Sequence, residues 1–437
     1  MQAATEKSAN NQLDHSIRQN RPWFWIPTLY FSEGLPYFAI VVLSTFMYKS
    51  FGLSNTEIAF YTAWFYLPWV IKPLWSPFVD IYRTKRFWVI AMQLILGAGL
   101  AGMAMILPLE NYLKYSLVFF WLLAFSSATH DIAADGYYMQ VLDKGQQAFF
   151  VGIRSTFYRI AMITGQGLIV ILAGKLENLY DVKTAWQLTM ALLSMILIGV
   201  ALYHALILPK EVVVTKKLSS DSKQNPIKGY LEVFKSFFAK KHIGIFIAFI
   251  LLYRLGEAQL TKIASLFMLD DLSEGGLGLS TEAVGFIYGT VGVAALVIGG
   301  ILGGILVSRH GLKAWIWWMA LAINLPNMVY IYMAYLQPQN TVLIQTLVAI
   351  EQFGYGFGFT AFMMYLIYIA EGNFKTAHYA IATGFMAMGM MIPGMVSGWI
   401  QDKLGYPHFF IWVMIATLPA FYVISRIPLE KDFAKAK

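Results

Sequence analysis

About twelve long apolar stretches follow one another along this chain, and they constrain its fold more than any other feature. A helix needs roughly 20 apolar residues to cross the hydrocarbon core of a bilayer, where its backbone polar groups must be satisfied within the segment. The sequence is 58% hydrophobic and only 13% charged, which is unlike a soluble domain. We therefore predict an all-α integral membrane fold. The expected transmembrane helices are 24–48, 57–79, 87–107, 116–141, 148–173, 185–207, 243–269, 281–307, 314–336, 341–370, 376–400 and 408–425.

A lysine-rich polar segment at 209–242 divides these spans into two sets of six, and we expect it to be a linker outside the bilayer. The predicted organisation is a tail at 1–23, a six-helix half at 24–208, the linker, a second six-helix half at 243–425 and a tail at 426–437. No small-residue cleavage site follows the first span, so we expect that span to stay in place as an anchor.

The distribution of Lys and Arg predicts the orientation of the chain. The side that holds both termini and the linker carries 22 of the 32 basic residues. The loops on the other side hold only Lys49, Lys114, Lys175, Lys183 and Lys403. Because positive loops are retained in the cytoplasm, both termini are expected there. Topology also explains the net charge of +8, so we expect no nucleic-acid partner. We also expect a monomer surrounded by membrane lipid.

Residue types needed for several kinds of chemistry are absent from the sequence. It contains no cysteine, which excludes disulfides and thiolate metal sites. It also lacks a phosphate-binding glycine loop before Lys-Ser/Thr, paired metal-binding histidines on a helix and a serine nucleophile elbow. We expect no enzymatic activity, no cofactor and no metal.

Two short basic loops, at 76–86 and 304–313, occupy equivalent places six spans apart, which is typical of a parallel repeat. Each resembles part of the cytoplasmic signature of the major facilitator superfamily, which runs from a Gly through Asp-Arg to a second Gly and then basic residues. The first loop keeps Asp80, and the second keeps Gly304 and Gly311. The residues expected to act in these gating loops are Asp80, Arg83, Lys85, Arg309 and Lys313.

Ionisable residues inside the predicted spans are few, and each marks a pathway or a structural pair because a buried charge is costly in a membrane. Most lie on the first, fourth, seventh and tenth spans, which surround the central cavity in the superfamily that the repeat resembles. The candidates for proton coupling or substrate binding are Glu33, Lys72, His130, Asp131, Asp135, Arg154, Arg159, Arg254, Glu257 and Glu351. Lys262 is a further charge on the seventh span.

Depth along the helices, at about 1.5 Å per residue, predicts how the charges in the first half pair. Glu33 and Lys72 are expected at a similar depth. Asp131 lies one helical turn before Asp135, and the two are expected level with the arginines of the fifth span, Asp131 with Arg159. A second cluster in the other half contains Arg254, Glu257 and Glu351.

Two interpretations of these clusters remain open. In the first, carboxylates take up and release protons while arginines hold an anionic or polar substrate. In the second, pairs such as Asp131 with Arg159 only hold helices together. His130 could relay a proton because its ordinary pKa is near neutrality, but we favour a satisfied polar residue beside Asp131.

The sequence also resembles one branch of the superfamily, the AmpG-type muropeptide permeases and the related acetyl-coenzyme A transporters. The resemblance rests on the segments 32–36, 72–80, 126–136, 158–162 and 252–258. It implies proton-coupled import of amino-sugar cell-wall fragments across a bacterial inner membrane. Asp131 matches the acid of the fourth helix in that family, and Arg159 and Arg254 match its basic positions.

The chain departs from this family where His130 replaces a common Gln and Glu257 a common Asp, so the cargo rests on resemblance alone. The alternatives are the same transporter fold with another oligosaccharide or an acyl-coenzyme A as cargo, and a membrane sensor that transports nothing. Buried charges on four cavity helices argue against the sensor.

Overall fold

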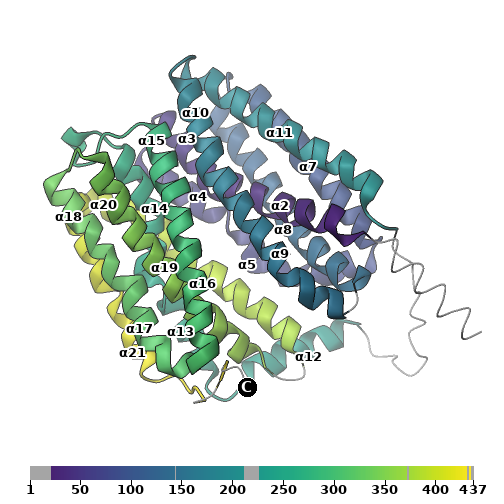
Figure 1. The fold of residues 1–437 in the computed structure, drawn as a ribbon. Coiled ribbons are helices and arrows are strands. Elements are labelled where there is room, and N and C mark those ends of the chain that lie inside the picture. The colour runs from purple at the N-terminus through teal and green to yellow at the C-terminus, as the bar shows by residue number, and fades with distance from the viewer. Residues whose placement is uncertain (1–20, 143, 211–225, 372–373, 431–432, 435–437) are drawn as a thin grey trace, which may run out of the picture.

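The computed structural model describes residues 21–142, 144–210, 226–371, 374–430 and 433–434, and every regular element within them is a helix (Figure 1). The predicted all-α fold is therefore confirmed. Many large apolar side chains are exposed along these helices, which is the character that a bilayer requires.

Helices of the first half follow the predicted spans closely. They are α2 (Pro22–Phe38), η1 (Ala39–Leu43), α3 (Ser44–Ser50), α4 (Asn55–Trp64), α5 (Leu67–Ile71), η2 (Lys72–Leu74), α6 (Ser76–Ile81), α7 (Lys85–Ile106), α8 (Tyr112–Val141), α9 (Lys144–Ile163), η3 (Thr164–Leu168), α10 (Ile169–Glu177) and α11 (Val182–Ile207). The linker residues 211–225 lie outside the described part of the chain, and so do the tail residues 1–20.

The second half begins after the linker helix α12 (Pro226–Phe238). Its elements are α13 (Ile243–Leu252), α14 (Leu255–Leu269), η4 (Leu272–Glu274), α15 (Thr281–Phe286), η5 (Ile287–Gly292), α16 (Val293–His310), α17 (Leu312–Asn324), η6 (Leu325–Asn327), α18 (Met328–Leu336), α19 (Thr341–Ala370), α20 (Lys375–Ala416) and α21 (Leu418–Ile424).

Ten helical stretches in the described residues are long and apolar enough to cross a membrane, and two local features reconcile this number with the predicted spans. The second span is broken into α4, α5, η2 and α6 at Pro68 and Pro73, because proline cannot donate the backbone hydrogen bond that a helix interior needs. The stretch at 377–424 contains two spans, since Gly405 has the non-helical angles φ 70° and ψ 163°.

The two halves meet tightly at one end of the molecule, which we call the far end because it lies opposite the linker helix α12 (Figure 1). Here α10 packs on α15, and a Cβ atom built on Gly174 would lie 2.3 Å from the backbone nitrogen of Glu282. Close to this contact, a Cβ on Gly289 would lie 1.9 Å from the backbone oxygen of Gln166. Only glycine permits such close approach of two backbones.

Buried hydrophobic side chains show the same asymmetry between the ends. At the far end one cluster joins both halves, with Phe46 from the first and Phe267 from the second. Towards the end that carries α12, which we call the linker end, the large clusters separate, one containing Trp25 and Tyr137 and the other Phe249. The halves are therefore packed together at the far end and apart at the linker end.

Candidate functional site

A cavity of about 680 Å³ lies between the two halves. It extends to Ser76, Met139 and Tyr379, close to the helix ends of the linker side, and its deepest lining includes Phe46 and Ser265. Cavities of this size hold drug-sized ligands. Most of its lining is apolar or aromatic, with a few charged side chains among the apolar ones.

The first-half wall of the cavity carries three carboxylates. Lys72 on η2 contacts Asp131 on α8 with 2.5 Å between Nζ and Oδ2. One turn further along α8, Asp135 accepts from Arg154 of α9 at 2.7 Å and from the Tyr30 hydroxyl at 3.2 Å.

Glu33 completes this acidic wall. Its side chain is 7% exposed, and its Oε2 atom has no hydrogen-bond partner. The carboxyl group interacts electrostatically with Asp131, Asp135 and Arg154. Three neighbouring carboxylates face two cations here, so this wall has room for one more positive charge, such as a proton.

The contact of Asp135 with Arg154 agrees with the prediction from depth, but the other two predicted pairs are wrong. Lys72 contacts Asp131 rather than Glu33, and Arg159 does not reach the α8 acids. Instead Arg159 donates to the backbone oxygen of Val297 at 3.5 Å, on α16 of the other half. Depth along a helix could not reveal this, because partners are decided by the rotation of each helix about its axis.

The second-half wall carries two cations. Arg254 lies at the break between α13 and α14, where its backbone leaves the helical region (φ −114°, ψ 20°), and its guanidinium contacts the Tyr355 hydroxyl and lies 4.8 Å from the Phe359 ring centre. Lys262 donates to the Thr62 hydroxyl of α4 at 2.9 Å. Broken helices are common at the binding sites of secondary transporters.

The two acids predicted for this half, Glu257 and Glu351, are buried but do not line the cavity. Glu257 accepts from the Thr261 hydroxyl at 3.0 Å, and Glu351 accepts from Tyr330 at 3.2 Å and from Gln352 at 3.0 Å. The predicted second cluster thus divides into an arginine at the cavity surface and acids behind it.

His130 also points away from the cavity. Its Nε2 atom lies 2.9 Å from Nε2 of Gln93, whose Oε1 atom lies 3.0 Å from Nδ1 of His204. The second ring nitrogen of His204 lies 2.9 Å from the Thr28 hydroxyl. These side chains form a buried polar network among α2, α7, α8 and α11 that satisfies His130.

The predicted gating residues lie at the linker end of their helices. Arg83 has a positive φ of 63° and stacks on Phe87 at 5.6 Å, while Lys85 begins α7 and packs its side chain against Gly136 of the cavity lining. Arg309 and Lys313 are exposed where α16 ends and α17 begins. The side chain of Asp80 lies outside the described part of the structure.

Aromatic rings line the middle of the cavity. Tyr37 packs edge-on against Trp69 with 5.1 Å between ring centres, and Tyr66 and Phe359 lie in the same lining. Aromatic rings of this kind pack against sugar faces or other apolar surfaces of a solute while their hydroxyl groups remain available as donors.

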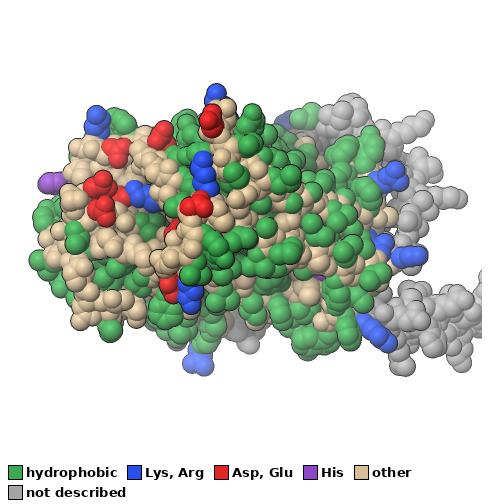
Figure 2. Space-filling model, turned by 90° about the horizontal axis from the view of Figure 1, so that it is seen from above, with side chains coloured by type: hydrophobic (Ala, Val, Ile, Leu, Met, Phe, Trp, Pro, Cys, Tyr) green, Lys and Arg blue, Asp and Glu red, His purple; other side chains and the backbone are tan. Residues whose placement is uncertain are grey.

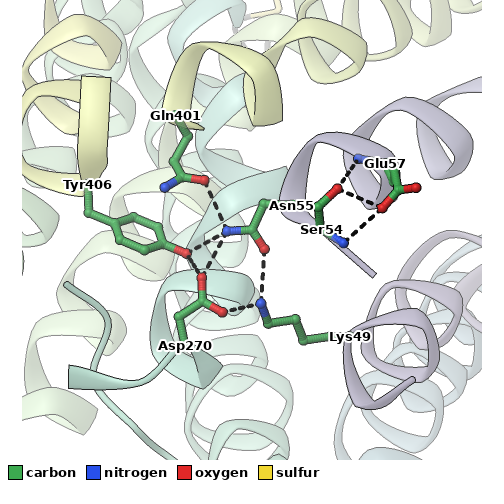
Figure 3. Close-up of polar contacts among 7 residues, drawn as sticks. All are labelled: Lys49, Ser54, Asn55, Glu57, Asp270, Gln401 and Tyr406. Carbon is green, nitrogen blue, oxygen red and sulfur yellow. Dashed lines mark hydrogen bonds and ion pairs between the residues drawn. The ribbon is translucent and has the colours of Figure 1, made fainter. Parts of the chain in front are cut away.

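The far end of the cavity is closed by a polar cluster that joins the halves (Figure 3). Asp270, after α14, forms an ion pair with Lys49 of α3 and accepts from the Tyr406 hydroxyl. Nδ2 of Asn55 lies 2.8 Å from Oδ2 of Asp270 and 3.0 Å from Oε1 of Gln401. We call these five residues the far-end cluster.

The outer face above the far-end cluster carries acidic and basic side chains together, with hydrophobic side chains around them (Figure 2). One of its contacts between the halves is the hydrogen bond from Thr56 to the exposed Asp402. This contact is solvated, whereas Asp270 is only 4% exposed, so the far-end cluster contributes more to closure.

Sequence reasoning missed the far-end cluster. Its members lie at the ends of different spans, and no spacing links Lys49 or Asn55 with Asp270, more than 200 positions later. The only signal was the type of residue, since Asp270 is an acid directly after an apolar span. Lys262 was recognised as a membrane charge but did not enter the predicted site.

Two bundles of membrane helices around a central, partly charged cavity define a membrane transporter. Residues 28–398 match the Major Facilitator Superfamily, and the chain belongs to that family.

The chain is similar to a permease and to a protein that is named as a transporter. The anhydromuropeptide permease of Escherichia coli K12 is 25% identical, with 82% of this chain and 70% of the relative covered. A Rickettsia conorii protein with AmpG in its name is 25% identical over 83% of this chain and 86% of its own length.

Solved structures of low sequence identity share the fold. The nucleoside transporter NupG gives a TM-score of 0.69 at 14% identity, covering 93% of this chain and 99% of that chain. A D-xylose-proton symporter gives 0.70 at 12% identity, with 95% and 98% covered.

Proposed function

We propose that this protein is a proton-coupled importer of muropeptides or related amino-sugar cell-wall fragments, located in a bacterial inner membrane with both termini in the cytoplasm. The observation that carries the proposal is the acidic wall of Glu33, Asp131 and Asp135, in a cavity that reaches the linker end and is closed at the far end. The two helical halves are the units that move in this proposal, and cargo is held between them.

Proton coupling is supported by the excess of carboxylates on this wall. Asp131 and Asp135 each form an ion pair with a cation, whereas Glu33 forms none with a described residue, and its Oε2 atom accepts no hydrogen bond there. A proton bound by this group of carboxylates neutralises the wall, and its release towards the cytoplasm restores the charge. Transport is driven when the two membrane faces differ in pH.

The cargo is supported by the permease to which the chain is similar and by the character of the cavity. Its aromatic middle fits the sugar rings of a muropeptide, and Arg254 provides a donor for the polar peptide part. A volume of about 680 Å³ is that of a small amphiphilic solute rather than of an ion.

Uptake into proteoliposomes tests the proposal. With an inward gradient of about one pH unit, one coupled proton can drive roughly tenfold accumulation of anhydromuropeptide. We expect accumulation of this order, and we expect a protonophore to reduce it to equilibration. A panel with another oligosaccharide and an acyl-coenzyme A as competitors identifies the cargo. Uptake of anhydromuropeptide that does not depend on the gradient would disprove coupling, and no uptake would disprove the cargo.

Closure of the far end can be locked covalently, because the chain contains no cysteine of its own. Thr56 and Asp402 lie in opposite halves at this end, and a hydrogen bond joins their side chains, so cysteines at these two positions can approach to disulfide distance without replacing a glycine. In Thr56→Cys with Asp402→Cys, we expect oxidation to reduce uptake by at least about tenfold and a reductant to restore it.

The two single-cysteine variants are the controls for this cross-link, since they carry the same substitutions and form no disulfide within one chain. Uptake by the fully cross-linked protein at the rate of the reduced protein would show that the far end does not need to open.

A further inference from the structure

Two cations of the second-half wall have no acidic partner in the cavity. Lys72 and Arg154 form ion pairs within 4.0 Å, whereas neither Arg254 nor Lys262 forms one with any described residue. Both side chains are at most 6% exposed. A buried cation without a counter-ion is costly, so this wall is short of negative charge.

The guanidinium of Arg254 also has spare donor capacity. Its Nε atom is buried without a hydrogen-bond partner, while the terminal nitrogen contacts Tyr355. The nearest acid along α14, Glu257, interacts electrostatically with Arg254 but bonds to Thr261 and does not line the cavity. It lowers the local positive potential without occupying the place where a ligand would lie.

The hydrogen-bond partner and the aromatic neighbour of Lys262 among the described residues are both neutral. Its ammonium group donates to Thr62 and lies 5.2 Å from the ring centre of Tyr66. Tyr66 also interacts electrostatically with Arg254. Arg254 and Lys262 are eight residues apart, about 12 Å along the axis of α14, and both side chains line the cavity.

From this arrangement we propose that Arg254 and Lys262 form an anion seat, which binds carboxylate or phosphate groups of the transported solute along α14. The seat deepens the proposed transport function and rests on it for its physiological ligand. The acidic wall faces it across the cavity, so an anionic solute lies with its charged groups on α14. Lys262 also determines specificity, because a neutral solute leaves the buried ammonium group unpaired.

The local potential at the seat can be measured without any substrate. Ser265 lines the cavity one helical turn after Lys262, and Ser265→Cys introduces the only thiol of the chain. The measured quantity is the rate at which an anionic methanethiosulfonate modifies this thiol, divided by the rate at which a cationic one does. Because steric access to the thiol affects both rates alike, their ratio reports the electrostatic potential near the thiol. We expect Lys262→Gln to lower this ratio roughly tenfold.

Two controls separate charge from structure in this experiment. Lys403→Gln removes the same charge from an exposed position of α20 and should leave the ratio unchanged. Thr62→Val removes the contact of Lys262 with the other half but keeps the cation, so a high ratio is expected to persist. An equal ratio with and without Lys262 would overturn the proposal.

The second measurement concerns the solute. In the wild type we expect anhydromuropeptide to bind more tightly than its carboxyl-amidated derivative, and we expect Lys262→Gln to reduce that preference about tenfold. Equal preference in both proteins would refute the role of Lys262 in specificity. If the wild type binds neither compound, the proposed cargo fails, while the reagent ratio still decides whether the seat attracts anions.

Discussion

Replacing Asp131 with asparagine is expected to reduce proton-driven uptake by at least about tenfold at matched expression. The amide keeps the size of the side chain but can neither balance the charge of Lys72 nor carry a proton. Both side chains of the pair are about one-fifth exposed, so the loss of stability is smaller than for a fully buried pair. Uptake into proteoliposomes with and without the gradient measures the effect.

A matched control for this substitution is Glu110→Gln, which makes the same chemical change in an exposed loop between α7 and α8. It should leave uptake unchanged. Asp135→Asn tests the second acid of α8, which loses its charge beside Arg154. Full uptake by both Asp131→Asn and Asp135→Asn would end the proposal that this wall couples protons to transport.

A charge exchange separates a structural pair from a proton carrier. Lys72→Asp combined with Asp131→Lys keeps opposite charges at the place where the native pair lies 2.5 Å apart but moves the carboxylate to η2. We expect thermal stability in detergent to return towards that of the wild type while gradient-driven uptake stays low. Recovery of uptake would instead mean that the pair only holds η2 against α8.

Asp270→Asn is expected to open the far end. The substitution removes the charge that holds Lys49 and weakens acceptance from Tyr406 and Asn55, while the size of the side chain is kept. Hydrogen bonds to charged groups contribute about 1.5–3 kcal/mol each. The open population at this end should therefore rise by roughly tenfold or more, since about 1.4 kcal/mol corresponds to a factor of ten.

Labelling of one introduced thiol measures this population. Thr45 lines the cavity beneath the far-end cluster, and Thr45→Cys should react faster with an impermeant maleimide in the Asp270→Asn background. Reagent added to intact cells should reach it, whereas inverted vesicles expose the linker end, so the comparison also tests the proposed orientation.

The control for the far-end cluster is another contact between the same two halves. Asp402→Asn removes the charge of the group that accepts from Thr56 but keeps an amide oxygen, at an exposed position where a hydrogen bond contributes little. In the Asp402→Asn background, the labelling rate of Thr45→Cys should stay close to its rate without that substitution. Equal rates for Asp270→Asn and Asp402→Asn would show that the buried cluster does not control closure.

The fold could be predicted from sequence because each apolar span is a local signal. Roughly 20 apolar residues in a bilayer have to form a helix whatever surrounds them. Two predicted spans are broken within their length, the second at Pro68 and Pro73 and the seventh at Arg254. Those residues changed how helices are divided and left the order of the spans unaltered.

Part of the site could be predicted for the same reason. A charge within an apolar span is visible in the sequence, and this signal alone identifies Asp131, Asp135 and Arg254 as candidates. Whether each faces the cavity depends on the rotation of its helix. That rotation points the His130 side chain towards a buried polar network and places Glu257 behind the cavity wall.

Sequence alone determined that this chain crosses a membrane many times, in two halves, and that costly charges lie within its helices. Tertiary structure alone decided which charges meet. Lys72 lies beside Asp131, and Lys49 reaches Asp270 across the halves, whereas Arg254 and Lys262 form no ion pair with a described residue. The physical reason is that hydrophobicity acts on each segment separately, whereas an ion pair depends on the positions of two segments at once.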